Sequence, residues 1–356
     1  MISALQTEPV HPALQAFNEQ ASICRKGGSP FSASLLDTLA MDFAKQGPVY
    51  RLAKDWDERA VQDAMALRVL GGLHRLVLDG AAPELAKHYP SVGGAPTAML
   101  AMEVIQTVAA FESALRSAVQ QQVQTNEVGR SSALLGGFLA IAQETKLPLC
   151  LLEIGSSAGL NLFWDQFAYD NEAFEWNTKQ KDVVLKTEWS GPAPACLSTV
   201  PVIAERAGCD VAPVDIHDDN ACRTLESFVW PDQPERLHRL RGAIAVARCR
   251  PYRLEQADAG EWLKKELADM KAGTCTVIFH SIMWTYMPVV TQEYIKVQIR
   301  RAGELATDAA PVAWLRLELD RPSVFPQMTL TLWPSGEERV LGTAHFHGTW
   351  VQWGST

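Results

Sequence analysis

The sequence predicts an α/β protein in which an N-terminal helical domain precedes a Rossmann-like, mostly parallel sheet that ends in an antiparallel hairpin. Three observations favour this fold class. Residues 1–147 repeat apolar side chains at helical spacing, and from residue 148 onward short apolar runs alternate with helical patterns. Near the end of the chain, a strictly alternating segment meets a turn. We therefore expect two domains, 1–147 and 148–356.

The N-terminal domain is expected to be helical because two long apolar stripes run through it. The first stripe recurs every four residues, and the second runs from Ile105 to Val119; the members of the first are Val61, Met65, Val69, Leu73 and Val77. The pair Gly93-Gly94 separates the two helical regions.

The second domain is expected to contain five strand–helix units followed by a hairpin. A run such as LCLLEI is apolar almost throughout, which is typical of a strand buried on both faces. A polar, aromatic stretch at 169–189 is expected to be an inserted hairpin. The strands are expected at 149–154, 210–216, 251–258, 275–280 and 311–320, and the helices at 159–167, 235–248, 261–270 and 292–305. The final hairpin pairs 328–333 with 338–344 around Pro334-Ser335-Gly336.

Charge and cysteine content narrow the classes of function. The net charge of −9 is poorly suited to binding nucleic acid or anionic lipid, and no run of lysine and arginine offsets it. We therefore expect a small-molecule partner and neither a nucleic acid nor a membrane. Seven cysteines, none spaced as CxxC, predict reduced thiols of a cytoplasmic protein. His345 and His347 share a strand face, but two ligands are too few for a metal site, so no metal is predicted.

The sharpest motif joins the first predicted strand to the following helix through a turn of small residues. In this turn, Gly155, Ser156, Ser157 and Gly159 let a ligand approach the backbone closely. Amides at the start of the helix would favour an anionic group such as a carboxylate. The motif is not a phosphate-binding P-loop, since no GK[ST] follows, and Ser157 stands where a dinucleotide-binding motif has its second glycine.

The pattern acid-x-Gly-x-x-x-Gly, beginning at Glu153 after a buried strand, resembles the first motif of class I S-adenosylmethionine-dependent methyltransferases. The expected order of strands and helices is similar to that fold as well. The resemblance implies S-adenosylmethionine as the cofactor. Its binding residues would be Glu153, Gly155, Ser156, Ser157, Gly159 and Asn161. Many methyltransferases carry glycine in place of Ser157, whose hydroxyl would either crowd the cofactor or donate to it.

In the resembled family, a second acid at the end of strand two holds the ribose hydroxyls, and a third acid follows strand three near the adenine. The sequence GCDVAP favours Asp210 for the second acid, whereas a strand over 210–216 favours Asp215, which we prefer. Asp258 fits the third position. For each of these residues, the alternative role is a helix N-cap or a turn residue.

Strand four ends in His280 and Ser281, with Tyr286 close behind, where the resembled enzymes line the gap between methyl donor and acceptor. His280 is a candidate general base because an imidazole changes charge near neutral pH, and Tyr286 is the second catalytic candidate. The alternative for His280 is a histidine satisfied within the core. Ser281 and Arg130 are expected to contact the cofactor, Arg130 at the methionine carboxylate; its alternative is an ion pair with Glu127.

Four segments together resemble a bacterial family of unknown function with a methyltransferase-like fold: LEIGSSAGLNL, AERAGCDVAPVD, WPDQPERLHRL and VIFHSIMWTY. The resemblance spans Thr125 to Leu317. It implies the fold and the cofactor but not the substrate. Together with the acidic charge, it leads us to expect a methyltransferase acting on an unidentified small molecule, with the helical domain as a lid that selects the acceptor. It indicates no oligomeric state.

Two other functions compete with this hypothesis. Gly155 to Gly159 also matches G-x-S-x-G, in which Ser157 would be the nucleophile of a serine hydrolase with Asp258 and either His280 or His345. That fold needs strands before the nucleophile, whereas residues 1–147 indicate helices. The other alternative is a non-catalytic cofactor-binding or interaction protein, because a fold does not determine a function.

Overall fold

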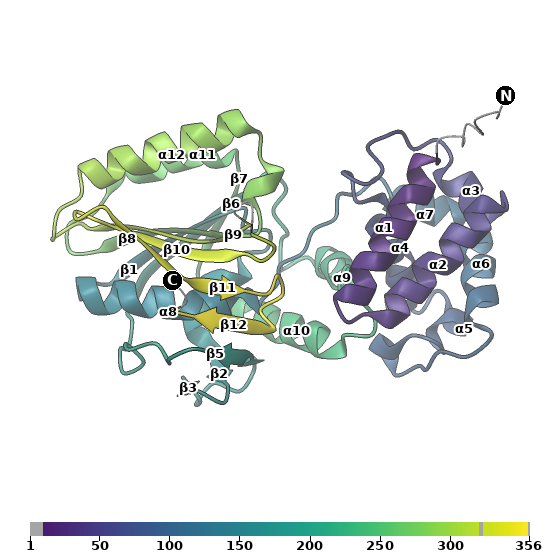
Figure 1. Ribbon diagram of the computed structural model, residues 1–356, viewed down its shortest axis with the longest axis horizontal. Coiled ribbons are helices and arrows are strands. Elements are labelled where there is room, and N and C mark those ends of the chain that lie inside the picture. The colour runs from purple at the N-terminus through teal and green to yellow at the C-terminus, as the bar shows by residue number, and fades with distance from the viewer. Residues whose placement is uncertain (1–9, 320–322, 355–356) are drawn as a thin grey trace, which may run out of the picture. The chain divides into compact units, whose positions relative to one another are not determined.

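The computed structural model describes residues 10–319 and 323–354. Its internal contacts divide the chain into two units (Figure 1). The helical unit consists of the described residues of Met1–Thr125 together with Asp219–His238, and the sheet unit consists of those of Asn126–Asp218 and Arg239–Thr356.

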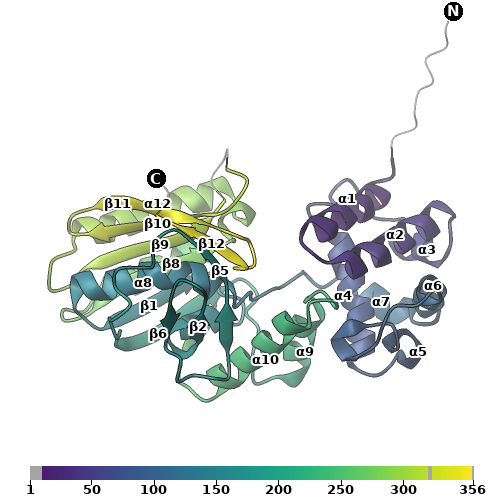
Figure 2. The same ribbon diagram turned by 60° about the horizontal axis from the view of Figure 1, so that its bottom comes forward.

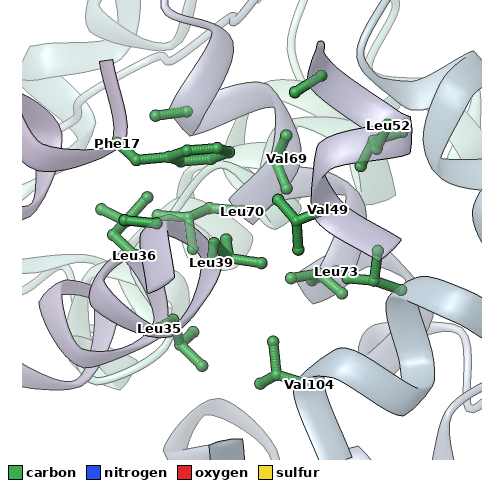
Figure 3. Packing of buried hydrophobic residues seen from close by; sticks show 14 of the residues in the cluster. Phe17, Leu35, Leu36, Leu39, Val49, Leu52, Val69, Leu70, Leu73 and Val104 are labelled. Carbon is green, nitrogen blue, oxygen red and sulfur yellow. The ribbon is translucent and has the colours of Figure 1, made fainter. Parts of the chain in front are cut away.

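The helical unit buries one continuous apolar core. Figure 3 shows how side chains such as Phe17, Leu39 and Leu73, each fully buried, meet at its centre. Proline occupies the first position of α1, α2, α3 and α5, where its missing N–H costs no helical hydrogen bond. The helices are α1 (Pro12–Lys26), α2 (Pro30–Ala44), α3 (Pro48–Ala53), α4 (Met65–Leu78), α5 (Pro83–Ala86), the 3₁₀ helix η1 (Pro90–Val92), α6 (Leu100–Ala110), α7 (Glu112–Ala118) and α9 (Asp219–Ser227).

The segment Asp219–His238, which follows strand β6 (Ile203–Asp210), completes the helical unit. Helix α9 packs on α4, and the indole of Trp230 packs against the same core. The carboxylate of Asp232 accepts a hydrogen bond from the backbone N–H of Phe31 at 3.0 Å and from the hydroxyl of Ser32 at 3.4 Å, and it is also paired with Ser29. The motif WPDQ thus fixes the start of α2.

The sheet unit is built on nine strands in the order β5-β12-β11-β10-β9-β8-β1-β6-β7. Strands β7, β6, β1, β8 and β9 are mutually parallel, whereas β10, β11 and β12 continue the sheet antiparallel. The strands are β1 (Leu149–Ile154), β5 (Glu188–Ser190), β6 (Ile203–Asp210), β7 (Arg253–Gln256), β8 (Cys275–Ser281), β9 (Val312–Glu318), β10 (Gln327–Trp333), β11 (Glu337–Ala344) and β12 (Trp350–Trp353).

Numbered along the chain, the five parallel strands have the spatial order 3-2-1-4-5. In a sheet of this kind, the order reverses between the first and fourth parallel strands, here β1 and β8, and ligands bind beyond the carboxyl ends of the strands at that point. The order of the strands therefore predicts a ligand site at the turns that follow β1, β6 and β8.

Helices cover both faces of the sheet, as Figures 1 and 2 show. Helix α8 (Arg130–Thr145) packs on β9, β10 and β11 from one face, and α12 (Val289–Glu304) packs on β9 and β10 from the other, beside α11 (Ala259–Glu266). The remaining elements are α10 (Pro234–Arg248), the 3₁₀ helices η2 (Leu160–Gln166), η3 (Leu267–Asp269) and η4 (Trp284–Tyr286), and a small sheet of β2 (Ala168–Asp170), β3 (Glu175–Trp176) and β4 (Val184–Lys186).

The predicted fold class is confirmed as an α/β chain with N-terminal helices and a mostly parallel sheet that ends in antiparallel strands. Three details differ. Helix α8 contacts the sheet, so the division of the contacts falls at Thr125 and not at residue 147. The strand expected at 210–216 is wrong, because β6 ends at Asp210 and a turn follows. The α-helix expected at 159–167 is a 3₁₀ helix.

Further predictions concern the end of the chain and its passage through membranes. The hairpin is confirmed by the antiparallel pairing of β10 with β11. The fifth predicted strand forms as β9, and its last predicted residue, Asp320, lies outside the described residues. Across residues 10–319 and 323–354, no helix combines the length and apolarity needed to cross a bilayer.

Candidate functional site

The turn after β1 is tied to the carboxyl end of β6. The backbone N–H and the hydroxyl of Ser156 both donate to the Cys209 carbonyl, at 3.0 and 3.1 Å. Gly155 and Ser157 have positive φ values of 65° and 53°. A left-handed conformation is uncommon for a residue with a side chain, so the surrounding contacts hold Ser157 in a constrained turn.

Protein atoms already bind the amides of this turn. The N–H of Ser157 donates to Asp210 Oδ2 at 2.8 Å, that of Gly159 to the Ser156 carbonyl at 2.7 Å, and that of Leu160 to Asn126 Oδ1 at 2.9 Å. Because a short 3₁₀ helix follows, no α-helix N-terminus forms here. The expectation that free helical amides await an anion is therefore corrected.

Side chains also cover both glycines of the motif. A Cβ atom on Gly155 would lie 2.6 Å from Met283 Cε, and one on Gly159 would lie 3.0 Å from the Tyr252 ring. Both positions thus need glycine for close packing within the protein. The space directly above Gly155 is filled by the thioether side chain of Met283.

Glu153 is the second-last residue of β1, and its carboxyl group is buried, with 3% of the residue's surface exposed. Its Oε2 atom has no hydrogen-bond partner among the described residues. Burial, and next the charge of Asp210, raise the pKa of Glu153 well above its ordinary value, while Arg130 and a hydrogen bond from Asn161 lower it. Asn161 is oriented in turn by the Ser131 hydroxyl, which donates to its Oδ1 at 2.8 Å.

A second orphaned oxygen lies in the same turn. Ser157 Oγ is buried and, within the described part of the chain, has no hydrogen-bond partner. Protein interiors leave few polar groups unsatisfied, since each costs roughly 1–3 kcal/mol. The pair of Glu153 Oε2 and Ser157 Oγ marks the end of β1 as a position where a ligand would gain polar contacts.

The acids that follow strands two and three have distinct environments. Asp210 ends β6 and accepts from the N–H of Ser157 and, at 3.0 Å, from that of Ala212. Asp215 is exposed in the following turn, where it accepts from the N–H of His217 at 2.8 Å. The preference for Asp215 rested on a strand that does not exist, and Asp210 holds the strand-end position. Asp258 is the N-cap of α11, as its alternative role predicted.

His280 is fully buried near the end of β8, and both ring nitrogens are engaged. The indole N–H of Trp314 donates to Nε2 at 3.1 Å, so Nδ1 carries the proton that is shared with Glu318 Oε1 at 2.7 Å. The ring also stacks on Trp284, with 4.8 Å between centroids. This geometry favours the alternative of a satisfied core histidine over a general base.

Glu318 also orders the segment that follows β8. Besides His280, its carboxylate accepts from the backbone N–H groups of Met283 at 3.1 Å and Trp284 at 3.2 Å. The same segment carries Tyr286, which is 80% exposed. Tyr286 is therefore available to a molecule approaching from solvent but is not packed into the site.

Arg130 connects the start of α8 to the end of β8. Its Nη1 donates to the carbonyl of Ser281 at 3.0 Å, and its Nε donates to the carbonyl of Phe346 at 3.0 Å. The guanidinium thus lies beside the point at which the strand order reverses, close enough to Glu153 to lower the pKa of that carboxyl group.

The structure brings most of the predicted residues to one edge of the sheet. The turn from Glu153 to Asn161 gathers there with Asp210, Arg130 and Ser281, whereas Asp215 and Tyr286 are exposed to solvent. Sequence reasoning missed Asn126, Met283 and Glu318. A carboxylate at the carboxyl end of a mostly apolar strand was a usable signal for Glu318.

Comparison with known families assigns most of the chain to one family. A family model described as "Uncharacterized protein conserved in bacteria (DUF2332)" matches residues 14–353. The chain belongs to this family. The match covers helices of the helical unit as well as the sheet, so the DUF2332 family extends well beyond the region from Thr125 to Leu317 that carried the resemblance. No curated protein and no solved structure matches the chain.

Proposed function

We propose that this DUF2332 protein is an S-adenosylmethionine-dependent methyltransferase that acts on a small-molecule acceptor. The observation that carries the proposal is the position of the turn after β1. It lies beside the reversal point of a 3-2-1-4-5 parallel set, where open α/β sheets bind ligands. The acids Glu153, Asp210 and Asp258 lie at or just after the carboxyl ends of the first three parallel strands.

Asp210 is suited to hold the ribose. Each of its carboxylate oxygens accepts one backbone N–H, which leaves a second lone pair on each oxygen for a ribose hydroxyl. In the proposal, Asp258 lies near the adenine, and Arg130 pairs with the methionine carboxylate. The cofactor supplies an activated methyl group on its sulfonium, and the residues of the chain bind it, orient it and exclude water.

The amino-acid end of the cofactor fits the turn only after one side chain moves. Glu153 Oε2 and Ser157 Oγ supply unsatisfied oxygens there, but Met283 lies against Gly155. Methionine is unbranched and readily adopts other rotamers, so its side chain can leave while Glu318 continues to hold the backbone N–H of Met283. Met283 is therefore the residue whose displacement the proposal requires.

Within this proposal, His280 positions other residues and does not take a proton from the acceptor. A substrate proton would have to displace the Trp314 N–H from Nε2. The pair of His280 and Glu318 instead fixes the segment that carries Met283 and Tyr286. Tyr286 remains the candidate for direct contact with the acceptor because its ring is exposed.

Calorimetry with S-adenosylmethionine and S-adenosylhomocysteine tests the proposal. We expect the wild type to bind both, Asp210→Asn to bind about tenfold more weakly, a loss of about 1.4 kcal/mol, and Asp215→Asn to bind like the wild type. Met283→Ala should bind more tightly because it clears the space above Gly155. No binding by the wild type, or equal losses in the two aspartate variants, would refute the proposed site. Binding without any transfer of a methyl group to a panel of small molecules would favour a cofactor-binding protein over an enzyme.

One observation favours a serine hydrolase as the second candidate. The φ of 53° at Ser157, between a strand and a helical turn, is the strained conformation that a nucleophile elbow adopts. However, no base is bonded to Ser157 Oγ among the described residues, and both nitrogens of His280 are engaged. A fluorophosphonate probe separates the candidates: labelling of the wild type but not of Ser157→Ala would favour the hydrolase.

A further inference from the structure

A cavity lies on the α12 side of the sheet, and no residue of the turn after β1 lines it. It has a volume of about 480 Å³, within the range of small-molecule sites. Helix α12 and the strands β9, β10 and β11, with the turn between the last two, supply its walls. The lining residues are Lys296, Arg300, Trp314, Arg316, Thr331, Trp333, Gly336 and Glu338.

The lining combines cations with aromatic rings. The lining holds three cations, Lys296, Arg300 and Arg316, and one carboxylate, that of Glu338. Glu293, just outside the lining, pairs with Lys296 at 2.8 Å, so the remaining excess of positive charge lies at the arginines. This is notable in a chain whose net charge is −9. A local excess of this sign attracts small anions, and the indoles of Trp314 and Trp333 add flat apolar surface.

The aromatic and guanidinium groups are held in place before any ligand arrives. The Trp314 indole is anchored through its N–H by His280, and the guanidinium carbon of Arg316 lies 4.0 Å from the centroid of the Trp314 ring. Arg316 Nη2 donates a hydrogen bond to Glu338 Oε2 at 2.6 Å. Trp333 packs closely on α12, since a Cβ on Gly303 would meet its ring at 2.5 Å. A site ordered in advance loses less entropy when it binds.

Arg316 also has an unmet hydrogen bond. Its Nε is buried, and no acceptor reaches it in the described part of the chain. A buried N–H of a charged group without an acceptor is costly, and an anionic oxygen would satisfy it. This observation is independent of the shape of the cavity and points to the same kind of ligand.

We propose that this cavity binds a small molecule in which a flat aromatic ring carries a phosphate or carboxylate group. The anion pairs with Arg316 and Arg300, with Lys296 at the rim, and the ring packs against Trp333 and the face of the Arg316 guanidinium. The proposal does not depend on methyl transfer, because none of the residues in the turn after β1 lines this cavity.

Fluorine NMR of protein labelled with 5-fluorotryptophan tests the proposal, with Trp314→Phe and Trp333→Phe used to assign the resonances. The ligand is 1-naphthyl phosphate, and 1-naphthoate tests whether a carboxylate suffices. Inorganic phosphate and 1-naphthol supply the charge and the ring alone. We expect saturable shifts at Trp314 and Trp333 with naphthyl phosphate, and binding about tenfold weaker with either fragment, corresponding to about 1.4 kcal/mol.

Two neighbouring arginines provide matched variants. Arg300→Gln removes a lining cation, whereas Arg301→Gln makes the same change one residue along α12, outside the lining. Arg300→Gln and Arg316→Gln should weaken binding of naphthyl phosphate, while Arg301→Gln should not. Because Arg300 is exposed, its variant keeps the test valid even if Arg316→Gln unfolds. Shifts confined to other tryptophans, equal binding of naphthol, or equal effects of Arg300→Gln and Arg301→Gln would overturn the proposal.

Discussion

Asp232 in the helical unit and Glu153 in the sheet unit both carry a carboxyl group, but the surroundings of the two groups differ. Asp232 receives three donors from the start of α2 and completes a structural network. Glu153 is almost fully buried, and one of its oxygens is left without a partner. The hydrogen bonds of Asp232 stabilise the fold. The unpaired oxygen of Glu153 lowers stability, and it lies at the edge of the sheet where α/β proteins bind ligands.

Two buried histidines show that the sheet unit does not leave all of its buried polar groups without partners. His74 in the helical unit is fully buried, and its nitrogens lie 3.1 Å from the Ser227 carbonyl and 2.8 Å from the Ser91 hydroxyl. His280 in the sheet unit is equally buried and equally satisfied. The orphaned hydroxyl of Tyr89 in the helical unit is a phenol whose pKa is raised by burial, so it stays neutral. Glu153 therefore stands out as a buried acid without full pairing.

The largest effect of a single substitution is expected at Asp232. Replacing it with alanine removes the acceptor for the N–H of Phe31 and the hydroxyls of Ser29 and Ser32. We expect the free energy of unfolding to fall by about 1–3 kcal/mol, as for buried donors left unpaired. Urea denaturation followed by circular dichroism measures the change. Asp232→Asn keeps one acceptor oxygen and should lose less; equal losses would show that the hydrogen bonds are unimportant.

A smaller effect, with a definite pH dependence, is expected at Glu153. Because burial raises the pKa of folded Glu153 above its ordinary 4.5, the folded protein holds this proton more tightly than the unfolded chain does. The stability that this group contributes is complete below the pKa of Glu153 in the unfolded chain, and it is lost as the pH rises through the pKa of Glu153 in the folded protein.

Glu153→Gln removes this titration. The variant should therefore become more stable relative to the wild type as the pH rises from about 4.5 to about 7.5. Denaturation of both proteins across this range measures the difference. A constant difference, or a variant that loses ground at higher pH, would mean that Glu153 is charged and well paired in the folded protein.

The smallest effect is expected at Asp215. Its side chain is exposed and accepts one backbone N–H within a turn. Asp215→Ala should change the free energy of unfolding by less than about 0.5 kcal/mol, as is usual for surface substitutions. A loss comparable to that of Asp232→Ala, measured in the same urea experiment, would contradict the assignment of Asp215 to an exposed turn.

Periodicity and turn signals in the sequence were enough to predict the layered fold. The apolar run before Glu153 and the alternation after Met328 give strands of the expected type, and the stripe through Val69 gives α4. The boundary at Thr125 was not predictable from local pattern. Helix α8 has many buried residues, as helices of either unit do. Its packing on β9, which is distant in the sequence, is what assigns it to the sheet unit.

The site was predictable only in part, because local patterns show a turn but not the distant segments that pack against it. The turn from Glu153 to Asn161 follows from its small residues, but what covers it comes from distant segments. The side chain of Met283 packs against Gly155, and Asn126 Oδ1 accepts a hydrogen bond from the backbone N–H of Leu160. Both contacts join residues that are far apart in the sequence. The error at Asp215 arose because an apolar run interrupted by Pro213 resembled a strand, whereas the chain turns directly after Asp210.

Hydrogen–deuterium exchange with and without S-adenosylhomocysteine tests most directly whether the orphaned oxygens at the end of β1 belong to a ligand site. We predict slower exchange in peptides that cover the turn from Glu153 to Asn161 and the turn after Asp210, and unchanged exchange in peptides that cover α2 and the Asp232 segment. Unchanged exchange in both turns at saturating ligand, or protection confined to the helical unit, would show that these oxygens do not belong to a ligand site.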